Sequence, residues 1–394
     1  MAHTKALRFK LPLGLSALAS AIGLAAFTAH CSLTASPGDY TSGLRAPPEV
    51  PAGQARRVVV IAGERDRLDP GELTTIATSD VWVANLDGYG SITGWTAAPS
   101  APFTGYARQA VVQGGNVYVI AKPQVVGEID NKPRLQQRGV AWIAATDQGL
   151  GPAWTGTAVD IPTYRDQGLV LLPGGLLTLG GTNLFVADAS FVSSYYPDVG
   201  FMPFDESAKT FGKRATVQKL PKGRSGIVPV VYKKFLYAVG GVSDDALSGS
   251  PSVEVATIGN GLEPFAATTA MQDPATQKPR NVKDFTACAG EGTLYVIGGE
   301  SIGTSDAVMT ARIDENNGQL SNWQGTATLP GGRADAGCFI ARGRLYVLGG
   351  RGKTGRLAEV LSAKILPDGT LEPWDSKPHE PLPAPRSQIA VATY

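Results

Sequence analysis

The chain has 394 residues, of which 43% are hydrophobic, so its composition argues against global disorder and allows a large core. The 35 Lys and Arg residues nearly balance the 34 Asp and Glu residues. This balance gives no electrostatic footprint for nucleic acid, and we exclude nucleic acid as a partner.

Residues 1–30 have the pattern of an export signal. The basic stretch "MAHTKALRFK" precedes the apolar run "LPLGLSALASAIGLAAFTA". The run approaches the length of a membrane span. Its Ala, Ser and Gly residues and Pro12 make it only weakly hydrophobic, so we expect a signal peptide rather than a permanent anchor.

Cys31 follows this run directly, in "AFTAHC", which resembles the lipobox of bacterial lipoproteins. Thr28 and His30 depart from the Leu and the small residue that a lipobox usually has at these positions. Lipidation of Cys31 and ordinary signal cleavage nearby therefore both stand as hypotheses. We expect an exported protein, either an outer membrane lipoprotein or a periplasmic or extracellular protein, with membrane contact only through an N-terminal lipid.

Residues 31–56 contain the polar, Pro/Gly-rich stretch "SPGDYTSGLRAPPEVPAGQA", which predicts a flexible tether. The folded body is expected over residues 57–394.

A short apolar strand that ends in paired glycines recurs through this body. The clear copies are "LLTLGG", "FLYAVGG", "TLYVIGG" and "RLYVLGG", and the weaker ones are "RVVVIAG" and "NVYVIAK". The apolar residues before the glycine positions are spaced by 59, 59, 60, 58 and 51 residues and are Ile61, Ile120, Leu179, Val239, Ile297 and Leu348. A repeat of this period is typical of propeller blades.

Each repeat carries further strand signals, and we name its strands A to D in chain order. Strand A opens with a basic residue, as in "GRSGIVPVV", and strand B ends in the glycines. Strand C alternates, as in "SVEVATI", and leads to a tight turn and to strand D with an aromatic residue. The turns are Asp87-Gly88, Gln148-Gly149, Asn260-Gly261, Asn317-Gly318 and Asp368-Gly369, and the aromatics are Trp95, Trp154, Phe265, Trp323 and Trp374. Four antiparallel strands repeated six times predict an all-β, six-bladed β-propeller rather than a row of sandwiches.

The strand count also predicts how the ring closes. The first repeat lacks a strand A, whereas the chain ends in "PLPAPRSQIAVATY", which has the form of one. We expect residues 386–393 to supply strand A of the first blade and so to remove an exposed edge. The third repeat has no turn dipeptide, and its strands C and D are expected near "VGFMPF" and "RATVQK".

Over residues 57–394 this arrangement resembles the kelch family, whose blades end their second strand in Gly-Gly and carry a Trp in the fourth. Forms such as "IDENNGQLSNW" and "ILPDGTLEPW" replace the usual Tyr-Asp unit, as in kelch-type repeats of bacterial exported proteins. The resemblance implies a non-catalytic binding or scaffold propeller at the bacterial cell envelope, with a protein or a glycan as partner. Some bacterial kelch-type propellers are sialic acid mutarotases, so a sugar-processing enzyme is the alternative.

Few residues of the body suit catalysis or metal binding. His379 is the only histidine beyond residue 30, which excludes a copper radical oxidase of similar fold, and nothing around it supports a catalytic triad. "DENNG" at 314–318 lacks the rest of a calcium loop and is interpreted as a hairpin turn. No helix follows the glycine pairs, so they are not phosphate loops. We predict no catalytic residue, no metal and no cofactor.

Cys288 and Cys338 lie in apolar segments, "FTACAG" and "DAGCFIA". Three cysteines are too few for a disulfide framework. The pattern favours buried free thiols, with a disulfide between these two as the alternative.

The ligand-binding candidates are the arginines that open strand A and two tyrosines of the third repeat. Strand A is innermost in kelch propellers, so these arginines would ring the channel mouth and suit carboxylate ligands. In the alternative, each arginine ties its blade to the next, and the aromatic insertion merely packs over a blade edge. The candidates are Arg108, Arg165, Arg224, Arg333, Arg386, Tyr195 and Tyr196, with Arg280 as a displaced sixth arginine.

The connections from B to C and from D to A are long, as in "ERDRLDPGELTTIAT", and the blade topology places both on one face. Binding residues concentrate on long loops of a rigid scaffold. We therefore expect a partner or ligand on the B–C/D–A face near the channel mouth.

Overall fold

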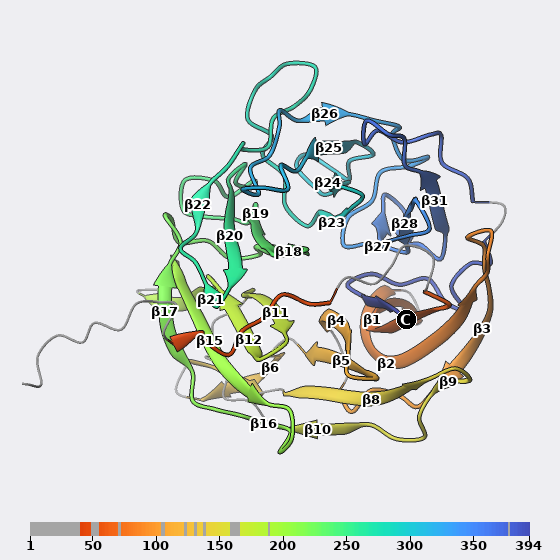
Figure 1. The fold of residues 1–394 in the computed structure, drawn as a ribbon, viewed down its shortest axis with the longest axis horizontal. Coiled ribbons are helices and arrows are strands. Elements are labelled where there is room, and N and C mark those ends of the chain that lie inside the picture. Colours follow the sequence, from red (N-terminus) through yellow and green to blue (C-terminus); the bar gives the residue numbers. More distant parts are fainter. Residues whose placement is uncertain are drawn as a thin grey trace, which may run out of the picture. The chain divides into compact units, whose positions relative to one another are not determined.

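The computed structural model describes residues 40–48, 55–69, 72–103, 107–121, 124–129, 132–136, 139–157, 166–187, 190–376 and 379–394. Six principal antiparallel sheets stand in a ring, one for each predicted blade (Figure 1). The prediction of an all-β, six-bladed propeller is confirmed. Among these residues, no helix is both long and apolar enough to cross a membrane.

The sheets keep the predicted strand order A–B–C–D. Blade one has β32 (Ala390–Thr393), β1 (Arg57–Asp69), β2 (Glu72–Leu86) and β3 (Ile92–Ala98). Blade two has β4 (Ala107–Gln113), β5 (Asn116–Ala121), β8 (Val140–Thr146) and β10 (Thr155–Thr157), and blade three has β11 (Gly168–Leu172), β12 (Gly175–Leu179), β15 (Asp198–Asp205) and β17 (Ala215–Lys219). Blade four has β18 (Val228–Tyr232), β19 (Phe235–Val239), β20 (Val253–Gly259) and β22 (Ala266–Ala267), and blade five has β23 (Thr286–Gly290), β24 (Thr293–Ile297), β25 (Val308–Arg312) and β26 (Gln324–Gly325). Blade six has β27 (Gly337–Ala341), β28 (Arg344–Leu348) and β31 (Val360–Lys364), and Asp375 bridges Ser362 at the fourth position.

The C-terminal strand closes the ring as predicted. Strand β32 pairs antiparallel with β1, with Val391 opposite Val60 and Thr393 opposite Val58. The innermost strands contact one another in the order β4, β11, β18, β23, β27 and β32, and β32 contacts β4 again. The apolar core divides into six clusters, and each lies between two neighbouring blades.

The paired glycines form the seam between neighbouring blades. The amide of Gly350 in blade six donates to the carbonyl of Arg386 in blade one at 2.8 Å. Gly349 has a φ of +57°, and a Cβ there would lie 2.5 Å from the same carbonyl, so only glycine fits. The equivalent bonds join Gly181 to Arg224 and Gly299 to Arg333. The repeated glycines therefore serve blade packing.

The repeated aromatic side chains form hydrogen bonds between neighbouring blades, from tyrosines of strand B and from tryptophans near the outer edge of each blade. Tyr346 of strand β28 donates its hydroxyl to the Gly90 carbonyl of the next blade, and Tyr295 does the same to Gly369. On the outer side, the Trp374 indole donates to the Ala327 carbonyl of the preceding blade at 2.9 Å. Trp95, Trp154 and Trp323 make equivalent bonds to Glu380, Pro99 and Thr269. The conspicuous residues of the repeat thus join each blade to its neighbours.

Several B–C connections that the sequence suggested were loops are β-hairpins. In blade one, β1 and β2 continue as a paired arm from Gly63 to Asp69. In the other blades the hairpins are β6 (Gln124–Ile129) with β7 (Lys132–Gln136), β13 (Thr182–Ala187) with β14 (Ser190–Tyr195), and β29 (Arg351–Gly352) with β30 (Gly355–Arg356).

Part of the predicted tether packs against the propeller. Leu44 is fully buried, and the Arg45 amide donates to the Pro173 carbonyl in the A–B turn of blade three. The Leu262 amide, in the C–D turn of blade four, donates to the Thr41 hydroxyl at 2.7 Å. Residues 41–45 therefore lie on the A–B/C–D face, opposite the B–C/D–A face.

Cys288 of β23 and Cys338 of β27 form a disulfide, with their Cα atoms 6.3 Å apart. The expectation of free thiols is wrong, and the alternative holds. The two residues are 50 positions apart, about one repeat, so they meet on adjacent innermost strands. The bond therefore links blades five and six.

Replacement of both cysteines by alanine is expected to lower the free energy of unfolding by about 2–4 kcal/mol, because the unfolded chain regains the entropy of an open loop. Denaturant titrations of the oxidised wild type and the double variant measure the difference. A reductant should destabilise the wild type alone. Equal midpoints for the oxidised wild type and the variant would contradict the linkage.

Candidate functional site at the channel mouth

The innermost strands enclose a central cavity of about 330 Å³. Apolar side chains form much of its wall, and the Cys288–Cys338 disulfide is part of it. Polar groups enter from Gln109, Thr286 and Gln388. A cavity of this size and mixed lining suits a small ligand.

The residues that lead into strand A at the channel mouth have a left-handed backbone. Asp284, Asp335 and Gln388 each have a φ of +54°. Their conformation joins the blades, because the Asp335 amide donates to the Asp284 carbonyl at 2.8 Å and the Gln388 amide donates to the Asp335 carbonyl at 2.9 Å. A left-handed non-glycine residue costs about 1–3 kcal/mol, and such strain concentrates at functional sites. Two carboxylates are thereby fixed at the mouth.

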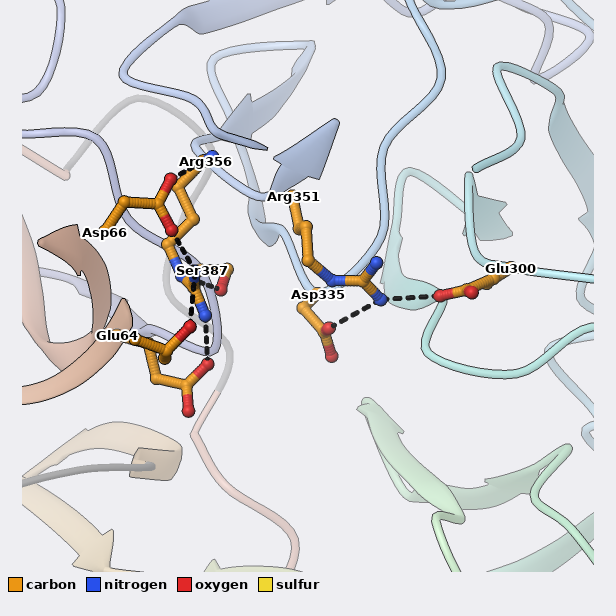
Figure 2. A network of polar contacts seen from close by, with 8 residues as sticks. Glu64, Asp66, Glu300, Asp335, Arg351, Arg356 and Ser387 are labelled. Carbon is orange, nitrogen blue, oxygen red and sulfur yellow. Dashed lines mark hydrogen bonds and ion pairs between the residues drawn. The ribbon is translucent and has the colours of Figure 1, made fainter. Parts of the chain in front are cut away.

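Glu300, Asp335 and Arg351 form a charged group above the cavity, which we call the mouth cluster. Arg351 donates to Glu300 at 2.5 Å and lies 3.7 Å from the Asp335 carboxylate (Figure 2). Glu300 comes from blade five, and the other two come from blade six. Their side chains are 29%, 18% and 34% exposed for Glu300, Asp335 and Arg351. All three are therefore accessible to a ligand.

The hydrogen bond from Arg351 lowers the pKa of Glu300 below its usual range and raises the pKa of Arg351. Glu300 is therefore ionised at neutral pH. It acts as a hydrogen-bond acceptor and not as a proton donor there. A hydroxyl or an ammonium group is the natural partner for such a carboxylate.

A second network supports the mouth from one side. Arg356 donates to the carboxylates of Glu64 and Asp66 and to the Ser387 hydroxyl at 3.1 Å (Figure 2). The side chains of Arg356 and Glu64 are only 7% and 10% exposed. This network joins blade six to blade one and is structural.

The strand-entry arginines that the structure describes are buried. Arg224 forms a two-point ion pair with Glu254, Arg333 donates to Glu359 at 2.7 Å, and Arg386 lies 3.5 Å from Asp80. Each partner acid lies in or beside strand C of the same blade. The exposed fractions of the three arginines are 0%, 1% and 0%. The guanidiniums thus tie strand A to strand C and do not face the channel.

The other sequence candidates are placed less completely. Tyr195 and Tyr196 are half-buried at the end of β14, and the Tyr196 amide donates to the Gly181 carbonyl. Arg280 is half-buried and donates to the Ser305 hydroxyl at 3.0 Å. Only the backbone of Arg108 is described, within β4, and Arg165 and Cys31 fall outside the described residues.

Sequence reasoning missed the mouth cluster, although a signal was present. Glu300 and Arg351 each follow a glycine pair directly, at equivalent positions of the repeat. Glu64 occupies the same position in blade one. In blades one, five and six the residue after strand B lies in the charged networks at the mouth, and its identity varies between these blades.

His379 has a structural role. Its Nδ1 accepts from the Ile92 amide at 3.2 Å, and its Nε2 lies 2.8 Å from the Ser362 hydroxyl. Burial and, next, the nearby Arg344 lower the pKa of His379 to about 4. Among the residues that the structure describes, no group of three or more His, Cys, Asp or Glu side chains is placed to hold a metal ion.

Because this pKa is depressed below its unfolded value of about 6.5, neutral His379 stabilises the fold above that pH. The contribution is expected to fall by on the order of 2 kcal/mol as the pH drops from about 6.5 to about 4. Urea titrations across this window should show a flatter decline for His379→Gln, which keeps an acceptor but does not titrate. A variant that loses stability as steeply as the wild type would contradict the assignment.

Comparisons with known proteins support the architecture. No protein-family model matches the chain, and no curated protein matches it. A solved structure, "Structure of YjhT", is similar with a TM-score of 0.55 and 14% sequence identity, and the match covers 83% of this chain and 99% of that chain. At this identity the likeness shows the propeller fold alone.

Proposed function

We propose that the protein is an exported, non-catalytic propeller that binds a polyhydroxylated ligand, such as a glycan terminus, on the B–C/D–A face. The observation that carries this proposal is the accessible mouth cluster above a cavity of about 330 Å³. Carboxylates accept hydrogen bonds from hydroxyl groups, and a guanidinium donates several in a fixed geometry. The mouth cluster offers both within one ligand's reach.

Two features support an exported location at the cell envelope. The N-terminal pattern, which lies outside the described residues, is that of an export signal with a candidate lipidation site at Cys31. The Cys288–Cys338 disulfide also suits an oxidising compartment.

The alternative function is a sugar-processing enzyme of the sialic acid mutarotase type. Such chemistry needs a proton donor and a proton acceptor near the sugar ring. In the mouth cluster, Glu300 is held ionised by Arg351, which favours binding over proton donation at neutral pH. The first function is therefore preferred.

A glycan array probed with the labelled chain tests the proposal. Arg351→Gln and Glu300→Gln are each expected to weaken binding to the captured glycan about tenfold, since each removes a charged hydrogen bond. Lys353→Gln is the control, because Lys353 is exposed in the same B–C connection. Binding that survives both mouth variants, or that needs the A–B turns instead, would contradict the proposed face. NMR detection of accelerated anomer exchange in the captured sugar would favour the enzyme.

A further inference from the structure

A second pocket, of about 690 Å³, opens on the A–B/C–D face at the base of blade one. Three blades build it. Arg57 begins β1, and Asp147 lies in the C–D turn of blade two. Arg342 lies in the A–B turn of blade six, and Tyr394 follows the closing strand β32. Arg56 also lines it. We call this the arginine pocket.

Three guanidiniums line the pocket beside two carboxylates, the Asp147 side chain and the α-carboxylate of Tyr394, of which one oxygen accepts from the Arg56 and Arg57 amides at 2.7 and 2.8 Å. Arg57 donates to the Asn85 side chain and to the Asp147 carbonyl, both at 2.7 Å, and Arg342 donates to the Ala55 carbonyl at 2.8 Å. These acceptors are neutral, and Arg56, Arg57 and Arg342 form no ion pair with any described residue. The Asp147 side chain is exposed at the rim. The pocket therefore keeps a net positive charge.

Two donors in the pocket wall lack partners. The Nε of Arg342 and the hydroxyl of Tyr394 are both inaccessible to solvent and without a hydrogen bond within the described structure. Burial raises the pKa of the Tyr394 hydroxyl, so it remains a donor at neutral pH. Buried donors are nearly always satisfied in folded proteins. Because neither atom has accessible surface, both donors lie behind the pocket wall, and an acceptor in the pocket reaches them only if the wall shifts.

We propose that the arginine pocket binds the phosphate group of a ligand. Planar guanidiniums recognise phosphate oxygens in a two-point geometry. Three guanidiniums beside two carboxylates leave the pocket cationic, and a phosphate group offers them more acceptor oxygens than a carboxylate does. The volume exceeds that of phosphate alone, so the group belongs to a larger molecule.

A phosphate of this kind has two sources, a soluble phosphate ester or a phospholipid headgroup. Residues 41–45 lie on the same face as the pocket. The shared chemistry is the phosphate group, and the experiment separates the two sources. The pocket lies on the face opposite the mouth cluster, so failure here would leave the proposed function untouched.

Calorimetric titration of the purified chain with inorganic phosphate tests the site, beside sedimentation with phosphatidylglycerol and phosphatidylcholine vesicles. Arg342→Gln is expected to weaken phosphate binding about tenfold or more. Lys234→Gln is the matched control, because Lys234 is exposed in the A–B turn of blade four on the same face. It should change the affinity by less than about twofold, in line with an exposed, distant charge.

Arg56→Gln separates binding from folding. It should weaken phosphate binding several-fold and leave the melting temperature unchanged, because the Arg56 side chain is exposed and forms no ion pair with a described residue. If Arg342→Gln lowers the melting temperature, Arg56→Gln carries the test. Retention on phosphatidylglycerol vesicles alone identifies a lipid headgroup, and binding of free phosphate identifies a soluble ligand. Absence of both, or equal phosphate affinity in Arg342→Gln and the wild type, overturns the proposal.

Discussion

Removal of residues 386–394 is expected to lower the free energy of unfolding by several kcal/mol. The deletion takes away β32, whose backbone pairs with β1, and the buried side chains of Ile389, Ala390 and Ala392. One large aliphatic side chain contributes about 1.5–3 kcal/mol on burial, and the lost backbone hydrogen bonds and open edge add to this. Thermal and denaturant unfolding of the truncated and full chains measure the loss.

A single substitution in the C-terminal segment measures part of this stability loss while β32 stays in place. Ile389→Ala is expected to cost about 2–4 kcal/mol, because Ile389 is 7% exposed and packs between blades one and six. Ile302→Ala is the control, since Ile302 is fully exposed in a turn. A truncated chain that melts at the wild-type temperature would show that β32 does not close the ring.

Much of this fold follows from local patterns that repeat. The glycine strands, the turn dipeptides and the outer aromatics recur at one period. In each blade where they occur, the glycines and aromatics therefore make the same kind of hydrogen bond to a neighbouring blade. Strands C and D of blade three were also predicted, near β15 and β17, because the repeat fixes where they must fall. Ring closure followed from counting strands, since one blade lacked a strand that the chain's end supplied.

The site could not be predicted in the same way, because it depends on what differs between blades. Glu300 and Arg351 occupy one repeat position in neighbouring blades, and only the ring brings them together. The disulfide likewise depends on two adjacent innermost strands, β23 and β27, that each have a cysteine at the same level along the channel. Because the residues at these positions differ from one repeat to the next, the repeat pattern does not predict them.

The strand-entry arginines show where a periodic signal leaves two interpretations open. Their recurrence fits both a ring of ligand-binding cations and a set of structural ties. For Arg224, Arg333 and Arg386 the ion-pair partners favour structural ties. Those partners, Glu254, Glu359 and Asp80, belong to or lie beside strand C, far from each arginine in sequence. Glu254, in strand C of blade four, is 4% exposed.

Arg224→Met is expected to lower the free energy of unfolding by about 3–5 kcal/mol, because it leaves the Glu254 carboxylate buried without its counter-charge. The guanidinium of Arg224 is fully buried and pairs with both carboxylate oxygens of Glu254. A methionine of similar length fills the space, so the loss reports charge rather than volume. Urea unfolding of the wild type and the variant gives the difference.

Two further variants make the test specific to burial. Arg224→Met combined with Glu254→Leu should recover most of the loss, since no unpaired charge remains inside. Arg333→Met should cost only about 1 kcal/mol, because the side chain of its partner Glu359 is 57% exposed and stays hydrated when the arginine is gone. Both arginines are buried, so the contrast mainly reports the exposure of the two acids, and the Arg333 bond to the Gly349 carbonyl at 3.2 Å is a smaller additional loss. Equal losses in Arg224→Met and Arg333→Met, or a double variant less stable than Arg224→Met, would refute the assignment of Arg224 and Glu254 as a buried tie that holds strand A to strand C.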